Sequence, residues 1–257
     1  MQRRVDRFNS QAGNLDAADG FKCEKCMNRG YIAKLVERGG MFYEVHEECV
    51  CMEIRKSILR MKASGLESSI RQCTFERFEV KSEWQQKMLD TAQDYLANGV
   101  SAGKWLFFGG AVGSGKTHLC TAVARKLLYQ MPVYYMTWPS ESAKLKAIIN
   151  DDEDYGREIR RLKNVDVLYI DDFFKPIMGD RGPLPPTSAD IRLAYEIIDH
   201  RYRNHMVTII SSERFLSELL DIDEAIGSRI AECSKGYVRQ LSRDRQKNQR
   251  LVNDELL

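Results

Sequence analysis

The sequence lacks long hydrophobic runs. No stretch reaches the roughly 18 uncharged apolar residues that a membrane-spanning helix needs. The first 20 residues, MQRRVDRFNSQAGNLDAADG, also lack the apolar centre of a secretory signal peptide. We therefore expect a cytoplasmic protein with no membrane partner. Residues 1–20 are polar and show no apolar period, which predicts a flexible tail.

An excess of charge of one sign is also missing. The formal net charge of +2 is the small difference between 39 basic and 37 acidic residues. This balance excludes a uniformly basic surface, but it decides nothing about a local DNA-binding site. The 257 residues, 43% of them hydrophobic, suit one α/β domain of ordinary size plus a small module, and there is no internal repeat or low-complexity tract.

Cysteine is present in an odd number, seven, which is poor material for disulfides in a reducing compartment. Four of the seven form two close pairs, Cys23-Glu-Lys-Cys26 and Cys49-Val-Cys51. Between the pairs lie two β-like runs, GYIAKLV and MFYEVH, joined by a turn at Arg38-Gly39-Gly40. The isolated Cys73, Cys120 and Cys233 are expected to be buried.

Two close cysteine pairs separated by a hairpin can converge on one tetrahedral ion, and four thiolates favour zinc. His46, three residues before Cys49, could replace one sulfur. A module of residues 21–52 is too short to bury much apolar area, so bound Zn²⁺ would supply most of its folding energy, of order 10 kcal/mol. This zinc is expected to be structural and to hold a docking surface for protein or nucleic acid. Residues 53–73, which contain EIRKSILRMKASGL, predict a basic helical connector that ends near Gly65.

From Phe75 onward, helical patterns alternate with short apolar runs, as in a parallel sheet covered on both faces. The predicted strands are residues 105–109, 133–136, 165–170 and 207–211. The predicted helices are residues 83–97, 117–129, 140–149 and 188–203. This segment is therefore expected to form the large α/β domain.

A phosphate-binding loop lies between the first of these strands and the next helix. The run GAVGSGKT fits GxxxxGK[ST], a pattern whose glycines let successive backbone N–H groups point at phosphate oxygens. Lys116 is expected to supply a cation at the β- and γ-phosphates, and the Thr117 hydroxyl to contact Mg²⁺. The predicted nucleotide-binding residues are Gly110, Ala111, Val112, Gly113, Ser114, Gly115, Lys116, Thr117 and His118.

A second motif, VDVLYIDD, is an apolar strand that ends in two carboxylates. Asp171 stands where a magnesium-binding acid is expected. Asp172 follows, at a position where hydrolytic proteins with such a phosphate-binding loop commonly have Glu. It is either a base acting on the attacking water or a residue that caps the next loop.

The order of KCEKCMNRGYI, ECVCM, a basic connector, TFERFEV, GAVGSGKT, VLYIDDFF, TIISSE, DEAIGSRI and KNQRL resembles the DnaC/DnaI-type helicase loaders, especially phage-encoded ones. The resemblance covers nearly the whole chain from about residue 21. It implies an AAA+ P-loop NTPase fold, three layers around a parallel sheet, over residues 74–257 and without a full lid domain. It also implies ATP and Mg²⁺ as cofactors, slow hydrolysis stimulated by DNA or a partner, a DnaB-type helicase and single-stranded DNA as partners, and self-assembly through the ATPase domain.

The resemblance also suggests roles for residues near the end of the chain. The strand at 207–211 would lie between the phosphate-loop strand and the acidic strand, bringing Ser211, Ser212 and Glu213 to the γ-phosphate, with Ser212 as the sensor 1 candidate. Arg229, on a short helix capped by Asp223, would reach a neighbouring subunit's nucleotide and stabilise transition-state charge. Arg250 is a weaker sensor 2 candidate. The basic run RQLSRDRQKNQR could be a solvated helix or a strip that faces DNA or nucleotide.

Three functions are therefore open. The first is an ATP-dependent loader that delivers a ring helicase onto single-stranded DNA. The second is an IstB-like transposase helper ATPase, which would have no evident need for the cysteine module. The third is a nucleotide-switched adaptor with little turnover, consistent with Asp172 in place of Glu.

The residues Phe173, Phe174 and Lys175 could contact single-stranded DNA, although packing at the sheet edge is the simpler expectation.

Overall fold

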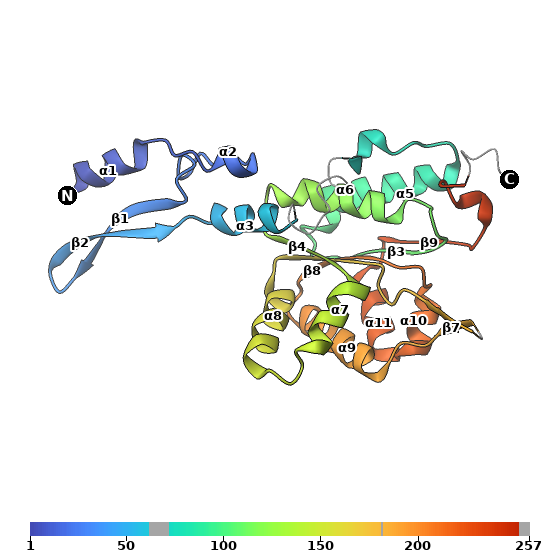
Figure 1. Ribbon diagram of the computed structural model, residues 1–257. Helices are drawn as coiled ribbons and strands as arrows, with labels where there is room; N and C mark the ends of the chain where they lie inside the picture. The colour runs from blue at the N-terminus through green and yellow to red at the C-terminus, as the bar shows by residue number, and fades with distance from the viewer. Residues whose placement is uncertain (62–71, 181, 252–257) are drawn as a thin grey trace. The chain divides into compact units, whose positions relative to one another are not determined.

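A computed structural model of the chain describes residues 1–61, 72–180 and 182–251 (Figure 1). Its contacts divide the chain into two compact units, Met1–Leu66 with Leu128–Pro132, and Glu67–Leu127 with Val133–Leu257. Each unit has its own hydrophobic cluster. In the part of the chain that is described, no helix has both the length and the apolar character of a membrane span.

The N-terminal unit is built around a β-hairpin. Strand β1 (Tyr31–Arg38) pairs antiparallel with β2 (Met41–Glu48). The turn between them contains Gly39 and Gly40, whose φ angles of 61° and 77° suit the tight two-residue turns of hairpins. The hairpin predicted between the cysteine pairs is thus confirmed.

The expected flexible tail is instead ordered in this structure. Residues before the hairpin form α1 (Gln2–Ser10) and α2 (Asp16–Asp19). The Asn9 amide both donates to the Ala33 carbonyl and accepts from the Ala33 N–H, each at 2.9 Å, and Val5 is buried. The prediction was wrong because a helix with only two apolar residues, Val5 and Phe8, shows no recognisable period in so polar a segment.

Helix α3 (Cys51–Met61) begins at the last cysteine and forms part of the same unit. Its Arg55 is buried and donates to both carboxylate oxygens of Asp19 at 2.7 Å. The first half of the predicted basic connector therefore packs within the N-terminal unit. Its predicted end near Gly65 lies outside the described residues.

The larger unit contains a five-stranded parallel sheet in the order β4-β5-β8-β3-β9. The strands are β3 (Leu106–Gly110), β4 (Val133–Thr137), β5 (Val167–Asp171), β8 (Val207–Ser211) and β9 (Val238–Leu241). The predicted insertion of β8 between β3 and β5 is confirmed, which brings three strand ends together. The edge strand β9 was missed, because three of its four residues, RQL, open the basic run that suggested a solvated helix.

Helices cover both faces of this sheet, with α5 and α6 on one face and α7 to α11 on the other (Figure 1). The 3-10 helix η2 (Phe75–Arg77) precedes them, the π-helix η3 (Tyr95–Gly99) follows α5, and the 3-10 helix η4 (Arg245–Lys247) comes last. Sequence patterns missed α8 and the small hairpin of β6 (Ile177–Gly179) and β7 (Gly182–Leu184). The α-helices are α5 (Glu83–Asp94), α6 (Lys116–Leu128), α7 (Trp138–Ala147), α8 (Asp152–Asn164), α9 (Ser188–Arg203), α10 (Leu216–Ile222) and α11 (Glu224–Cys233).

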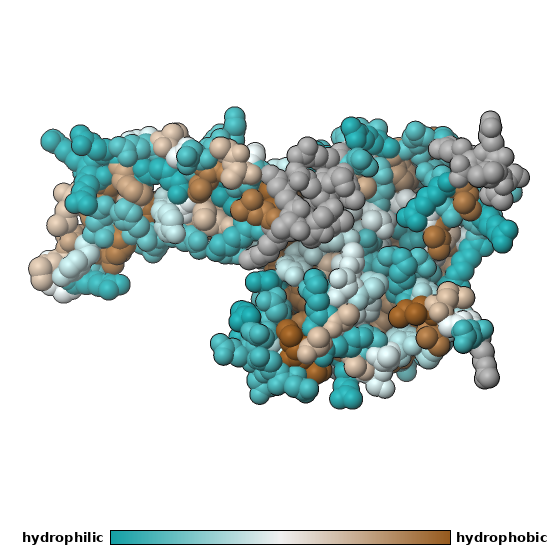
Figure 2. Space-filling model, viewed as in Figure 1, coloured by the Kyte–Doolittle hydropathy of each residue, from teal (hydrophilic) through white to brown (hydrophobic). Residues whose placement is uncertain are grey.

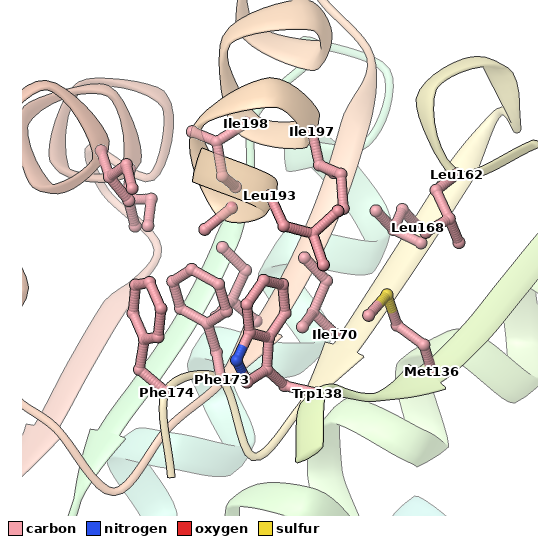
Figure 3. Close-up of a cluster of buried hydrophobic side chains, with 14 of the residues drawn as sticks. Met136, Trp138, Leu162, Leu168, Ile170, Phe173, Phe174, Leu193, Ile197 and Ile198 are labelled. Carbon is pink, nitrogen blue, oxygen red and sulfur yellow. The ribbon is translucent and has the colours of Figure 1, made fainter. Parts of the chain in front are cut away.

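The main core lies between the sheet and helices α7 to α11 (Figure 3). The Trp138 ring packs edge-on against Phe173 and Phe174, with centroid distances of 4.9 and 5.3 Å. Because Phe173 and Phe174 are only 0% and 2% exposed, they do not offer stacking surfaces to single-stranded DNA. They anchor the segment that follows the acidic strand β5.

Arg201 on α9 fixes the starts of β5 and β8. Its fully buried guanidinium donates to the Thr208 hydroxyl and to backbone carbonyls before β5 and at β8. Burial lowers the pKa of Arg201 to about 9, which keeps the group charged at neutral pH. The carbonyl acceptors belong to Leu162, Lys163, Val165, Asp166 and Val207.

Candidate functional site

The glycine-rich loop connects β3 to α6 and contains three glycines in the left-handed region. Gly110, Gly113 and Gly115 have φ angles of 94°, 70° and 85°, which side chains rarely tolerate. A Cβ on Gly113 would also lie 1.9 Å from the Asn248 Oδ1, and one on Gly110 would lie 2.1 Å from the Leu241 carbonyl oxygen. These positions therefore require glycine on both backbone and packing grounds.

Lys116 is held inside this loop. Its ammonium donates to the carbonyl oxygens of Gly110 at 2.9 Å and Ala111 at 2.6 Å, and the residue is buried. Burial lowers the pKa of Lys116, although nearby carboxylates, including Glu213 and Asp172, oppose the shift. A cation sequestered from water in this way is well suited to a polyanionic ligand.

Asp171, at the end of β5, meets groups from three other elements. Its Oδ1 accepts from the Thr117 hydroxyl at 2.9 Å and from the Ser211 hydroxyl, and its Oδ2 accepts from the Tyr135 hydroxyl at 3.1 Å. The two side chains expected to share Mg²⁺, Thr117 and Asp171, are thus in direct contact. A hydroxyl and a carboxylate provide the hard oxygen ligands that Mg²⁺ prefers.

Lys116, Thr117 and Asp171 line a cavity of about 370 Å³, enough for a substantial part of a nucleotide. Phosphate-loop residues form one wall, and the ends of β5 and β8 form another. The lining residues are Cys73, Val112, Gly113, Ser114, Gly115, Lys116, Thr117, His118, Asp171, Asp172, Lys175, Glu213 and Arg250.

Ser212, the sensor 1 candidate, is not among the described residues that line this cavity. Its hydroxyl donates to the Phe173 carbonyl at 2.7 Å and accepts from the Arg214 N–H at 3.0 Å, and the residue is fully buried. The hydroxyl is therefore committed to holding the loop after β5. Its neighbours reach the site instead, Ser211 through Asp171 and Glu213 as part of the cavity wall.

Asp172 lines the cavity and forms an ion pair there. Its carboxylate is paired with the Lys175 ammonium at 2.7 Å, and its φ angle is 54°, which is uncommon for a residue other than glycine. Lys175 also approaches the Glu213 carboxylate, at 3.6 Å. The position proposed for a base is thus neutralised by a neighbouring cation.

Two further segments close around the phosphate loop. The His118 ring contacts the Thr74 carbonyl at 2.7 Å, and a Cβ on Gly115 would lie 2.6 Å from the Phe78 ring, so TFERF covers the loop from one side. The Gln249 N–H donates to the Gly113 carbonyl at 3.0 Å. Sequence reasoning gave TFERFEV no role in the site. The run KNQRL, where Arg250 was a weak candidate, lies against the loop and brings Arg250 to the cavity.

Arg229 lies on α11, whose first turn is capped by Asp223 as predicted. It is not among the described residues that line the cavity. Its guanidinium pairs with Asp199 of α9 at 2.9 Å and donates to the Ala225 carbonyl at 2.8 Å, and its side chain is 20% exposed. The role in a neighbouring subunit stays a prediction, and it would require Arg229 to leave Asp199.

The second candidate site is the cysteine cluster in the N-terminal unit. The sulfur atoms of Cys23, Cys26, Cys49 and Cys51 all lie within 4.8 Å of one another. The Cys23–Cys49 and Cys26–Cys51 sulfur distances are 3.9 and 3.5 Å. Tetrahedral zinc with Zn–S bonds of about 2.3 Å separates its sulfurs by about 3.8 Å, so the four thiols fit such an ion.

Surrounding groups support the cluster and exclude His46 from it. Burial raises the pKa of the Cys26 thiol, but the Gly30 N–H, which donates to the Cys26 sulfur at 3.3 Å, lowers it. Together with further hydrogen bonds from the Cys51 and Cys23 thiols and the Arg29 backbone, this brings the pKa of Cys26 to about 7. His46 instead contacts Glu44 at 2.9 Å and packs against Phe8. Of the isolated cysteines, Cys120 is buried as predicted, whereas Cys73 and Cys233 are only half-buried.

Comparison with known proteins agrees with the fold and with the phosphate loop. Residues 36–226 match the sequence profile described as "IstB-like ATP binding protein". This chain belongs to that family. The match spans the phosphate loop and the acidic strand, and it ends at Ile226 in the first turn of α11.

Individual relatives carry names from phage elements and replication. The phage-like element PBSX protein XkdC of Bacillus subtilis (strain 168) is 32% identical over 231 residues, covering 86% of this chain and 82% of XkdC. The replicative helicase loader DnaC of Escherichia coli (strain K12) is 28% identical over 111 residues, which is 42% of this chain and 45% of DnaC. The crystal structure of the DnaC helicase loader covers 69% of this chain and 99% of its own, with a TM-score of 0.55 at 21% identity, which supports the AAA+ fold.

Proposed function

We propose that this chain is an ATP-dependent loader that delivers a DnaB-type ring helicase onto single-stranded DNA. The observation that carries the proposal is the presence, in one chain, of a nucleotide cavity in a unit whose fold is similar to that of DnaC, and of a four-cysteine unit. In this proposal the cysteine unit holds the docking surface for the helicase, and the ATPase unit assembles with itself and contacts DNA.

The nucleotide site supports binding and slow turnover of ATP. The loop N–H groups and Lys116 would bind the β- and γ-phosphates, and Thr117 and Asp171 would hold Mg²⁺, which neutralises phosphate charge when bound. Asp172 would orient the attacking water once its carboxylate is free of Lys175. Turnover is expected to be slow and stimulated by DNA or a partner, because Asp172 is one methylene shorter than the Glu that commonly stands at this position.

One observation favours the transposase-helper alternative, namely the family description itself, which is IstB-like. Such a helper would share the nucleotide cavity. The four-cysteine unit has no evident use in that role, and for this reason we prefer the loader.

The Asp172–Lys175 pair favours the adaptor alternative, in which ATP is bound and read but scarcely hydrolysed. Phosphate release measured with and without single-stranded DNA separates the two cases. A loader with stimulated turnover releases phosphate faster when DNA is present, whereas an adaptor shows no such increase.

A pull-down tests the helicase partner directly. The full-length chain, carrying an affinity tag, is mixed with a purified DnaB-type helicase from the same host or phage. We expect ATP-dependent capture of the helicase by the normal chain, and loss of capture when Cys23 and Cys26 are both changed to Ser. Cys233→Ser is the matched control, since that half-buried thiol is not part of the cluster. A normal chain that binds nucleotide and zinc but never captures the helicase would contradict the proposal.

A further inference from the structure

Lys175 is a second lysine in the nucleotide cavity that the phosphate-loop motif does not account for. It lines the cavity together with Asp172 and Glu213, on the wall formed by the ends of β5 and β8. Its ammonium lies 2.7 Å from the Asp172 carboxylate and 3.6 Å from that of Glu213. Among the described residues, Lys116 and Lys175 are the only lysines that line this cavity.

The position of Lys175 is fixed by the segment before it. Phe173 and Phe174 are buried against Trp138, as Figure 3 shows. The Lys175 N–H donates to the Asp172 carbonyl at 3.0 Å, closing a turn in which Asp172 and Phe174 both have left-handed φ angles, 54° and 48°. The backbone of Lys175 is therefore anchored, while its long side chain, 43% exposed, can change partner.

The ion pairs of Lys175 are of the kind that exchange readily. A partly exposed pair between residues three apart contributes only about 0–1 kcal/mol. A phosphate oxygen carries more charge than one carboxylate oxygen and accepts stronger charge-assisted bonds. A nucleotide that presented its last phosphate to this wall could take Lys175 from Asp172 without a large cost.

We propose that Lys175 binds the terminal phosphate of ATP and thereby distinguishes ATP from ADP. The inference rests on the proposed use of this cavity for ATP. Lys116 and the Thr117–Asp171 pair lie at the loop, where the β- and γ-phosphates are held. Lys175 contacts Asp172, the residue beside the magnesium carboxylate, which places it on the γ-phosphate side. Its transfer to the phosphate would also release Asp172 to orient water.

The test measures affinities of the full-length chain for ADP and for the non-hydrolysable analogue AMPPNP, both with Mg²⁺. Lys175→Gln removes the charge and keeps most of the length. We expect it to weaken AMPPNP binding about tenfold or more, in line with loss of a charge-assisted hydrogen bond. ADP binding should change by less than about twofold and also reports that the variant is folded. Lys175→Arg should restore most of the AMPPNP affinity.

Lys144→Gln is the matched control, because Lys144 also pairs with a carboxylate three residues away, Glu141, but lies on the exposed surface of α7. It should leave both affinities unchanged. If Lys175→Gln weakens both nucleotides equally, or neither, the inference is overturned. Faster phosphate release with an unchanged AMPPNP-to-ADP ratio would also overturn it, since Lys175 would then only restrain Asp172. A normal chain that binds neither nucleotide would contradict the proposed function as well.

Discussion

Single residues decide whether the cavity can hold a polyphosphate. Lys116 contributes the buried ammonium, and its contacts with the Gly110 and Ala111 carbonyls keep it within the loop. Glycine is required at positions 110 and 113 by close approach to the chain segments at Leu241 and Asn248. The GxxxxGK[ST] pattern was enough to predict these residues, because the backbone conformation of the loop requires them whatever the rest of the fold is.

We predict that Lys116→Ala abolishes ATP-dependent activity. Losing a charge-assisted contact of about 1.5–3 kcal/mol lowers nucleotide affinity roughly 10- to 100-fold, and turnover falls further because transition-state charge is no longer stabilised. Titration of the purified variant with a fluorescent ATP analogue, alongside phosphate release, measures both effects. Undiminished affinity and turnover in a folded Lys116→Ala chain would remove the phosphate-site assignment.

Other residues could not be placed from the sequence. The choice among Ser211, Ser212 and Glu213 depends on which side chain turns toward the cavity at the end of β8. The Ser212 hydroxyl does not, because it donates to the Phe173 carbonyl. The pairing of Arg229 with Asp199 depends on how α11 packs against α9, which involves residues far apart in sequence. Spacing alone contains no information on either contact.

Among the elements, strands with apolar runs and helices with regularly spaced apolar residues were predictable, whereas polar elements, including the 13-residue helix α8, were not. The helix predicted at residues 188–203 is α9, and its start is fixed by a capping box between Thr187 and Asp190. Strand β9 and helix α1 have few apolar residues and are stabilised by pairing with β3 and by contacts with β1, respectively. The exposed apolar side chains of the β6–β7 hairpin, Ile177, Met178 and Leu184, give the hydrophobic area seen there in Figure 2.

The cysteine unit yields a prediction about metal content. We expect about one zinc ion per chain, because the four sulfur atoms fit one tetrahedral ion. Changing Cys23 and Cys26 to Ser should remove the ion and unfold the unit, since a bound ion supplies most of the folding energy of so small a core. Elemental analysis of protein purified under reducing, chelator-free conditions checks this. A zinc-free normal chain with its hairpin intact by NMR would sink the assignment.

At the scale of the whole molecule, substitution of Arg229 tests whether one chain completes the nucleotide site of a neighbouring chain. Arg229→Ala should leave nucleotide affinity nearly unchanged while turnover or ATP-dependent assembly falls sharply, because the transition-state charge loses its partner across the interface. The expected loss is roughly 10³-fold or more where such a residue completes a site. Asp199→Asn, which removes the intrachain partner, is the informative companion and should not mimic this loss.

Mixing two inactive variants sharpens this test. Arg229→Ala chains keep an intact phosphate loop, and Lys116→Ala chains keep an intact Arg229, so alternating assemblies of the two should recover some activity. If the mixture stays inactive although both variants fold and assemble together, or if Arg229→Ala alone is fully active, Arg229 acts only within its own chain, as its contact with Asp199 suggests.

Helicase loading onto closed circular single-stranded DNA tests the central claim most directly. A closed ring cannot thread onto a circle that has no end, so unwinding of a short strand annealed to the circle requires a loader. With a DnaB-type helicase and ATP, we predict rapid unwinding when the normal chain is present and little without it or with Lys116→Ala. Equal unwinding in all three reactions, with the normal chain shown to bind ATP and the helicase shown to be active on linear DNA, would contradict the account.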